Sequence, residues 1–145
     1  MTPEAMASLH RRASAGTRPW SAAEYAQLTT AKNRLLITAE HGFVLGQLSA
    51  ADAEIFMIIV EPDHQRKGLG LNYLTRFEIK AHSAGGSRCL LEVAASNHAA
   101  QALYTRAGYT QVGTRKGYYK LPNGQPDDAW VMQKQLNTLK QPHGI

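Results

Sequence analysis

The spacing of apolar and polar residues differs from one part of the chain to the next, and the N-terminal part predicts two helices. Thr2-Pro3-Glu4 is typical of a helix start, with Thr2 as the cap and Pro3 at the first helical position, and the helix should run to about Arg12. The stretch Ala13–Pro19 follows as a loop. Ser21-Ala22-Ala23-Glu24 is a capping box, in which each side chain accepts from the other residue's backbone N–H, so a second helix should reach about Thr29.

The middle and the end of the chain predict strands. Asn33–Ala39 and Gly42–Ser49 flank a short turn that suits a hairpin, and the most apolar strand, Glu54–Val60, ends at Glu61-Pro62. Further along the chain, three more segments have strand character, the last two separated by the turn-rich Leu121-Pro122-Asn123-Gly124: Arg88–Ala94, Tyr109–Thr114 and Ala129–Leu136.

Two more helices separate these strands. The longer one opens at Gly68 and ends at Gly85-Gly86, and its buried stripe recurs at three- and four-residue steps through Leu71, Leu74, Phe77 and Ala81. The shorter one is capped by Ser96 or Asn97, runs to about Ala107 and closes at Gly108. The order α-α-β-β-β-α-β-α-β-β predicts a mixed α/β (α+β) fold, a mixed sheet with helices on both faces. We expect a single domain over residues 1–136 and a tail over 137–145.

Composition narrows the class of protein. A chain of 145 residues fits one soluble domain, and its net charge of +5 favours an anionic partner, which could be nucleic acid, a membrane surface or a phosphorylated cofactor. The single cysteine, Cys89, excludes an intrachain disulfide and is typical of a reducing compartment. The apolar run Ile55–Val60 is far shorter than the about 20 residues that span a bilayer, and the first residues do not resemble a signal peptide, so we expect a cytoplasmic protein.

The most distinctive local feature is Gln65-Arg66-Lys67-Gly68-Leu69-Gly70 at the mouth of the long helix. Free backbone N–H groups and the positive end of the helix dipole favour an anion there, and Arg66 and Lys67 add positive charge. Glycine at 68 and 70 would let phosphate oxygens approach the main chain. The loop fits neither the dinucleotide-binding fingerprint nor the Walker A pattern. By itself it is equally consistent with a glycine-rich turn that starts a helix.

Two later residues suggest proton transfer. Glu92 interrupts an otherwise apolar strand, and a carboxylate raised in pKa by burial can serve as a general base. Tyr104 lies seven residues after Asn97, two helical turns, so both side chains project from one face of the short helix. The alternatives are a structural carboxylate or one that meets an arginine for Glu92, a core aromatic for Tyr104, and a plain helix cap for Asn97.

Together these segments resemble the GNAT acetyltransferases. The spacing Q-x-x-G-x-G after Val60-Glu61-Pro62 is similar to motif A of that superfamily, and Leu91-Glu92-Val93, Ser96-Asn97 and Ala102-Leu103-Tyr104 are similar to motif B. The resemblance implies a mostly antiparallel sheet that is splayed at an acetyl-CoA site. It also implies a cofactor-binding set made up of Ile58, Ile59, Val60, Arg66, Lys67, Gly68, Leu69, Gly70, Leu71 and Asn97, and no metal.

Within the superfamily the chain resembles, from about Arg18 to Leu136, the bacterial enzymes that acetylate the N-terminal alanine of a small-subunit ribosomal protein. In those enzymes the residues at the positions of Glu92 and Tyr104 are the catalytic base and acid. The resemblance implies direct transfer from acetyl-CoA to a protein N-terminal peptide, without direct contact with nucleic acid or membrane; oligomeric state stays open. Departures from the pattern are a missing first strand, Leu71 in place of a basic residue, and Ala94 in place of arginine.

Other readings of the chain stay open. One is a GNAT enzyme that acts on a small-molecule amine or a lysine side chain, and another is a non-catalytic module that binds CoA or RNA. Arg115-Lys116 with Tyr118-Tyr119 could form a basic and aromatic nucleic-acid patch, although the family pattern places them beside the peptide cleft. Cys89 is a buried residue rather than a nucleophile in this reading, and the six histidines show no metal-ligand spacing.

Overall fold

The computed structural model describes residues 1–13 and 18–136, so the predicted tail over 137–145 lies outside the described residues. The described elements follow the predicted order, with one short 3-10 turn added: α1 (Pro3–Ala13), α2 (Ala22–Thr30), β1 (Arg34–Ala39), β2 (Gly42–Ser49), β3 (Asp52–Val60), η1 (Pro62–His64), α3 (Leu69–Ser83), β4 (Arg88–Ala94), α4 (His98–Arg106), β5 (Thr110–Lys120) and β6 (Pro126–Gln135). None of these helices is long and apolar enough to cross a membrane.

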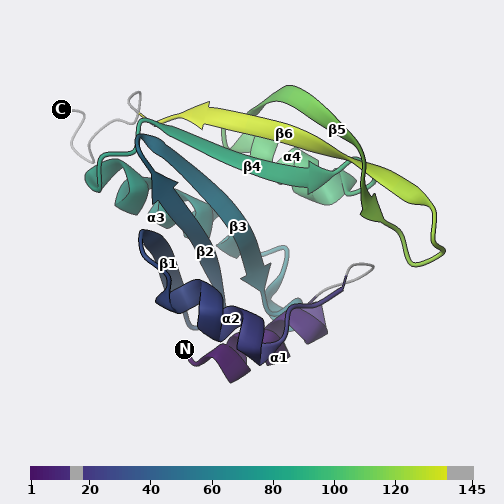
Figure 1. Ribbon diagram of the computed structural model, residues 1–145, viewed down its shortest axis with the longest axis horizontal. Helices are drawn as coiled ribbons and strands as arrows, with labels where there is room; N and C mark the ends of the chain where they lie inside the picture. The colour runs from purple at the N-terminus through teal and green to yellow at the C-terminus, as the bar shows by residue number, and fades with distance from the viewer. Residues whose placement is uncertain (14–17, 137–145) are drawn as a thin grey trace.

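The six strands form one sheet in the order β1-β2-β3-β4-β6-β5. Only β3 and β4 are parallel, because α3 crosses over between them, and the other neighbours run antiparallel. This confirms the predicted mixed, mostly antiparallel sheet. In Figure 1 the sheet opens into two wings, with β1–β3 in one and β4–β6 in the other.

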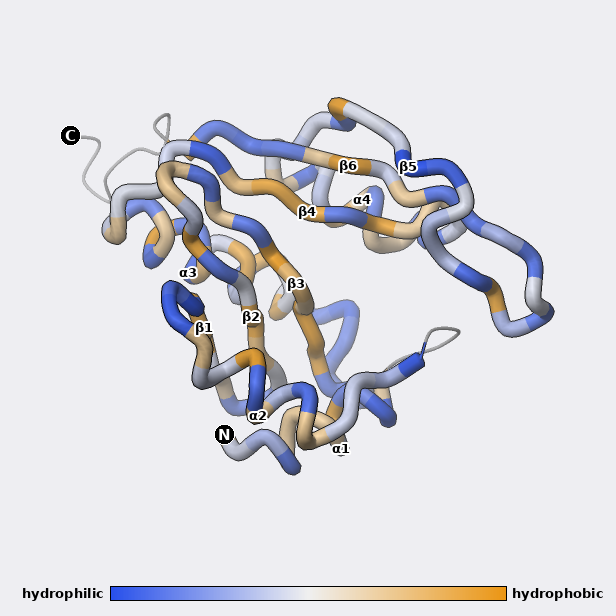
Figure 2. The backbone as a smooth tube through the Cα atoms, in the orientation of Figure 1, coloured by the Kyte–Doolittle hydropathy of each residue, from blue (hydrophilic) through white to orange (hydrophobic). Residues whose placement is uncertain are grey.

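Helices cover both faces of the sheet because β2 is apolar on both of its sides. Val44 packs into a core with α3 and α4, whereas its neighbours Phe43 and Leu45 pack on the opposite face with α1 and α2. All three side chains are fully buried. The tube in Figure 2 shows the corresponding hydrophobic segments along β2, β3 and β4.

The buried stripe of α3 confirms most of the predicted periodicity. Leu74, Phe77 and Ala81 are fully buried, and Leu71 is half-buried near the start of the helix. Phe77 packs so tightly on β2 that a Cβ at Gly46 would lie 2.6 Å from the Phe77 ring, so only glycine fits there.

The helix also buries a charge that the apolar stripe did not predict. Glu78 is 1% exposed, accepts a hydrogen bond from the Tyr109 hydroxyl at 2.8 Å and pairs with Lys134 Nζ at 2.9 Å. These two partners satisfy the carboxylate inside the core and tie α3 to β6.

The two wings of the sheet are joined only at one end. β3 and β4 pair at Asp52↔Arg88, Ala53↔Cys89 and Glu54↔Leu90, and beyond these positions the strands have no register with each other. Arg88 donates to both carboxylate oxygens of Asp52, at 3.1 and 2.9 Å, which braces the closed end. A register shift in the β2–β3 ladder leaves Phe56 without a partner in β2, and such a bulge bends the strand away. The sheet is therefore splayed, as the resemblance implied.

The last two strands are longer than expected, since we placed their ends at Thr114 and Ala129, whereas β5 continues to Lys120 and β6 begins at Pro126. The added residues are mostly exposed, so burial imposes no alternation on them. The expected turn at Leu121–Gly124 does join the two strands, and Leu121 N–H donates to Gln125 O at 2.8 Å.

Candidate active site

A cleft of 790 Å³ occupies the gap where β3 and β4 diverge. Both strands contribute walls, and α4, the end of β5, α1 and the residues just before α2 also contribute side chains. The lining residues are His10, Arg18, Trp20, Glu54, Ile55, Phe56, Met57, Ile58, Leu91, Glu92, Val93, Ala94, Asn97, Ala100, Tyr104, Tyr118, Tyr119 and Lys120.

Glu92 reaches this cleft from the middle of β4, opposite Val131 of β6. Its neighbours Leu91 and Val93 are buried in the core beneath α3 and α4, so alternation along the strand directs Glu92 to the other face of the sheet. Its side chain is 18% exposed, and its Oε1 lies 3.0 Å from Nε of Arg115 on β5. The alternative in which Glu92 meets an arginine is thus present in the structure, together with a place in the cleft.

Tyr104 reaches the same cleft from α4, on the opposite face of the sheet. The residue is 7% exposed, and burial, with smaller effects from Tyr119 and Cys89, raises the pKa of its phenol. Its hydroxyl has no hydrogen-bond partner within residues 1–13 and 18–136. Every fully buried side-chain oxygen in these residues does have such a partner, so the Tyr104 hydroxyl is not fully buried. The hydroxyl is therefore accessible from the cleft and stays protonated at neutral pH.

The splay explains how these two residues can share one site. A continuous sheet would separate Glu92 from Tyr104, because they lie on opposite faces of β4. Beyond Leu90, β3 diverges from β4, so the gap between the two strands is open to both faces of the sheet. A carboxylate on one side and a phenol on the other can then contact two different substrates that meet in the gap.

Asn97 is both a helix cap and a residue of the cleft wall. Its side chain caps α4 by accepting from the N–H of Ala100 at 3.1 Å, and it also lines the cleft. The preceding loop is fixed to β6, since the Ser96 hydroxyl donates to Asp127 Oδ2 at 2.6 Å and Ala95 N–H donates to Asp128 O at 2.8 Å. These bonds hold the N-terminus of α4 against the cleft.

The glycine-rich loop follows the end of β3 and is exposed from Gln65 to Gly68. Arg66 and Gly68 both have left-handed backbones, with φ of 62° and 80°, which turn the chain sharply before α3. Gly68 is the N-cap of α3 and brings no side-chain cap, so the first N–H groups of the helix keep their capacity to bind an anion.

Gly70 has a packing role that the sequence did not indicate. A Cβ at this position would lie 3.3 Å from Cδ2 of Leu103, so the glycine lets the first turn of α3 approach α4. At Gly68 a Cβ would meet nothing within 4 Å, and the left-handed backbone is what favours glycine there. Leu69 and Leu71 are half-buried in the same helical turn.

The predicted cofactor residues do not all line the cleft. Of the three predicted residues in β3, Ile58 lines the cleft. Ile59 is buried against α1 and α2, and Val60 packs against the part of the core that α3 covers. The loop 65–70 also lies outside the lining. A cofactor that contacted the loop, β3 and Tyr104 would have to extend from the first turn of α3 into the gap.

Several aromatic residues of the cleft were not assigned to it from the sequence. Trp20 and Phe56 both line it. Tyr118 and Tyr119 do so as well, as the family pattern implied, because β5 bulges between Arg115 and Tyr119. Gly117 has a φ of 61° in this bulge and donates to Asp128 Oδ1 at 2.9 Å. Burial, together with Glu92, raises the pKa of Tyr119 to about 12.

Comparisons with known proteins agree with this geometry. The model of the acetyltransferase (GNAT) family matches residues 6–109. The ribosomal protein bS18-alanine N-acetyltransferase of Escherichia coli (strain K12) is 32% identical over 135 residues, which cover 90% of each chain. The N-alpha-acetyltransferase RimI of Mycobacterium tuberculosis is 28% identical over 137 residues, 88% of this chain and 83% of that one.

Solved structures give the same result. The crystal structure of the ribosomal-protein-S18-alanine N-acetyltransferase from Escherichia coli has a TM-score of 0.82 at 31% identity and covers 97% of this chain and 90% of that chain. Arabidopsis thaliana NAA60 in complex with acetyl-CoA shares the fold alone, with a TM-score of 0.79 at 16% identity over 93% of each chain.

The prediction of an acetyl-CoA-dependent acetyltransferase is confirmed by the family match and by these relatives, over the same segments that carried the resemblance in the sequence. The chain belongs to the acetyltransferase (GNAT) family.

Proposed function

We propose that this enzyme transfers the acetyl group of acetyl-CoA to the N-terminal α-amine of a protein, and that its acceptor is a small-subunit ribosomal protein that begins with alanine. The observation that carries the proposal is the similarity, over 90% of both chains, to an enzyme named for that acceptor. A ribosomal protein is made in the cytoplasm, so the proposal also places the enzyme there.

The cleft supports an extended acceptor. Trp20, Phe56 and Tyr118 are apolar walls on which the first residues of a peptide can lie, and all three surround the side from which Glu92 reaches the gap. The hairpin that carries Tyr118 is a long, exposed extension of the sheet in Figure 1, which suits contact with a chain rather than with a compact amine.

Glu92 is the proposed base. An α-amine has an ordinary pKa of about 7.7–8.0, so at neutral pH most of it is protonated and cannot attack a thioester. Glu92 takes that proton, directly or through a water molecule, while Arg115 shifts into solvent, to which its side chain is already 58% exposed. The neutral nitrogen then bonds to the thioester carbon, and the extra proton that this nitrogen carries after the attack passes to solvent water as the amide forms.

Tyr104 is the proposed acid. The tetrahedral intermediate collapses by breaking the carbon–sulfur bond, and the CoA thiolate leaves with the pair of electrons from that bond. The Tyr104 hydroxyl, which stays protonated because burial raises its pKa, gives the thiolate its proton and is later reprotonated from solvent. N–H groups of β3 that face away from β2 would stabilise the oxyanion.

The loop 65–70 is the proposed binding site for the pyrophosphate of acetyl-CoA. The uncapped N-terminus of α3 supplies N–H donors, and Arg66 and Lys67 lie exposed beside it. In this arrangement Ile58, Ile59 and Val60 offer main-chain groups to the pantetheine arm, and Leu69, Leu71 and Asn97 border its path.

The acceptor can be tested with a panel of synthetic peptides and mass spectrometry. Peptides that differ only in a first residue of alanine, a larger side chain or an acetylated alanine are incubated with acetyl-CoA, each also carrying an internal lysine. The proposal predicts one acetyl group on the α-nitrogen of the alanine peptide and none on the blocked one. Acetylation of the lysine in all peptides, or of a polyamine but no peptide, would contradict it.

A further inference from the structure

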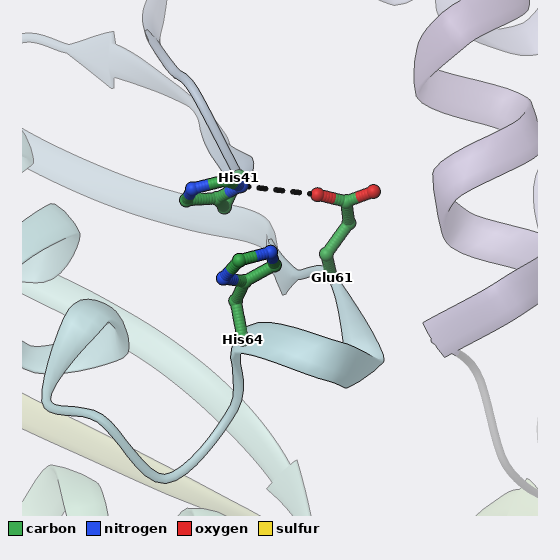
Figure 3. Close-up of side chains that lie close together, drawn as sticks. All are labelled: His41, Glu61 and His64. Carbon is green, nitrogen blue, oxygen red and sulfur yellow. Dashed lines mark hydrogen bonds and ion pairs between the residues drawn. The ribbon is translucent and has the colours of Figure 1, made fainter.

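Two histidines and a glutamate meet outside the cleft, at the end of β3. His41 comes from the β1–β2 turn, Glu61 follows β3, and His64 ends the short turn η1. One ligand atom of each residue lies within 4.8 Å of the others, and His41 Nδ1 is 3.2 Å from Glu61 Oε2. Figure 3 shows the two imidazole rings stacked face to face, with the Glu61 carboxylate directed at His41.

The backbone around these side chains is fixed by hydrogen bonds. Glu61 N–H donates to His41 O at 2.7 Å, and His64 N–H donates to Glu61 O at 2.9 Å. Arg12 of α1 pairs with Glu61 Oε1 at 3.1 Å, which leaves Oε2 on the histidine side. Three potential ligands from two turns are therefore held together before any ion binds.

The imidazole rings need one adjustment to share an ion. Their centroids are 3.5 Å apart and their planes differ by 11°, so their nitrogen lone pairs lie in two nearly parallel planes and do not meet at one point. The torsion that turns an imidazole is soft, and rotating one ring directs a nitrogen of each at a common point. Zinc bonds of about 2.0–2.2 Å would draw together ligand atoms that lie near the 4.8 Å limit, whereas His41 Nδ1 and Glu61 Oε2, at 3.2 Å, are already close enough.

We propose that His41, Glu61 and His64 form a binding site for a divalent first-row transition metal ion, with Zn²⁺ as the best fit. Imidazole nitrogen favours such ions, whereas Mg²⁺ and Ca²⁺ favour oxygen ligands. All three side chains are partly exposed, so an ion can enter and water can complete a tetrahedral set. None of the three lines the cleft, and the transfer chemistry requires no metal. The ion would link the β1–β2 turn to the segment that leads into the loop 65–70.

The test is a titration of Zn²⁺ into the full-length chain, free of any histidine tag and treated with a chelator, followed by calorimetry. We expect one Zn²⁺ per chain. His64→Phe keeps a ring that can stack on His41 but has no ring nitrogen, and it should weaken binding at least about tenfold, since even outer-shell substitutions cost about 10–100-fold. The matched variant His82→Phe, near the end of α3, should bind like the wild type.

A second measurement separates loss of the site from loss of the fold. Circular dichroism and thermal unfolding without metal should be alike for the wild type and both variants, and Glu61→Gln replaces His64→Phe if that variant does not fold. Visible absorption of bound Co²⁺ should appear in the wild type and in His82→Phe only. No stoichiometric binding by the wild type, or equal binding by His64→Phe, would overturn the site.

Discussion

Nε of Arg115 lies 3.0 Å from Oε1 of Glu92, so the proposed base is paired with a cation when the cleft holds no substrate. The central carbon of the Arg115 guanidinium group also lies 5.3 Å from the centre of the Tyr118 ring. Arg115 comes from β5 and its side chain is 58% exposed, so water screens its side of the pair and weakens the attraction, although the Glu92 side chain is only 18% exposed. An incoming ammonium group can therefore take the place of Arg115 at low cost.

Arg115→Met should leave most of the activity. Removing a weak, exposed partner is expected to change kcat/KM for an alanine peptide by about fivefold or less, the range of exposed ion pairs. Steady-state rates of thiol release measure it. If Arg115→Met were as inactive as a variant of Glu92, then Arg115 itself would have to contact the reacting groups.

Tyr104→Phe should lower kcat by about 10²–10⁴-fold, the usual contribution of a general acid, with little change in KM for acetyl-CoA. Stability should change little, because the hydroxyl gives up no hydrogen bond within the described residues. The measurements are initial rates and thermal unfolding of the same preparation.

Tyr109→Phe is the matched control, since it removes a hydroxyl only a few residues away. That hydroxyl donates to the buried Glu78, so its loss should destabilise the fold by about 1–3 kcal/mol while the folded enzyme stays active. If both variants lost activity and stability together, the distinction between a catalytic and a structural tyrosine would be wrong.

The double variant Arg66→Gln, Lys67→Gln should raise KM for acetyl-CoA about tenfold and leave KM for the peptide unchanged. Two positive side chains beside the α3 N-terminus would each contribute a charge-assisted contact to a phosphate. Rates at varied acetyl-CoA and varied peptide separate the two constants. Lys32→Gln, remote from the loop in sequence, serves as the charge control. An equal rise in KM for acetyl-CoA in that variant would indicate that the overall positive charge of the protein, and not a phosphate-binding site at the loop, attracts the cofactor.

His10 should make stability depend on pH. Burial, with Arg18 as a second cause, lowers its pKa below the ordinary 6.5, and its Nδ1 accepts from Trp20 N–H at 3.1 Å. The native state then binds fewer protons than the unfolded state, so stability is fully present above about pH 6.5 and is lost as the pH falls through the folded pKa.

His10→Gln removes this titration. Urea midpoints measured at several values above and below pH 6.5 should fall less steeply on acidification in His10→Gln than in the wild type. His82→Gln is the control and should retain the wild-type slope. Parallel slopes in the wild type and His10→Gln would contradict the assignment.

Much of the fold followed from local patterns in the sequence. The capping box at Ser21 and Glu24 is present, with Ser21 N–H donating to Glu24 at 3.0 Å, and the apolar face of α3 lies where its period placed it. Such features depend on residues close in sequence. The ends of β5 and β6 were missed because the hairpin there is exposed and its side chains carry no burial pattern.

The site was less predictable where it depends on distant residues. Glu92 and Tyr104 were candidates from spacing and resemblance, but their access to one cleft from opposite faces of β4 follows from where β3 leaves its partner. The contact of Glu92 with Arg115, and of Gly70 with Leu103, joins residues that no periodicity relates. His41 and His64 lie 23 positions apart and meet only because β2 and β3 form a hairpin.

The most direct test of the central claim, acetyl transfer in the cleft with Glu92 as the base, is the initial rate of thiol release from acetyl-CoA with an alanine-starting peptide. Glu92→Gln should lower kcat/KM by about 10²–10⁴-fold, whereas Glu54→Gln, which removes a carboxylate from the opposite wall of the same cleft, should stay close to the wild type. Equal turnover by Glu92→Gln and the wild type, with an unchanged pH profile, would contradict the account.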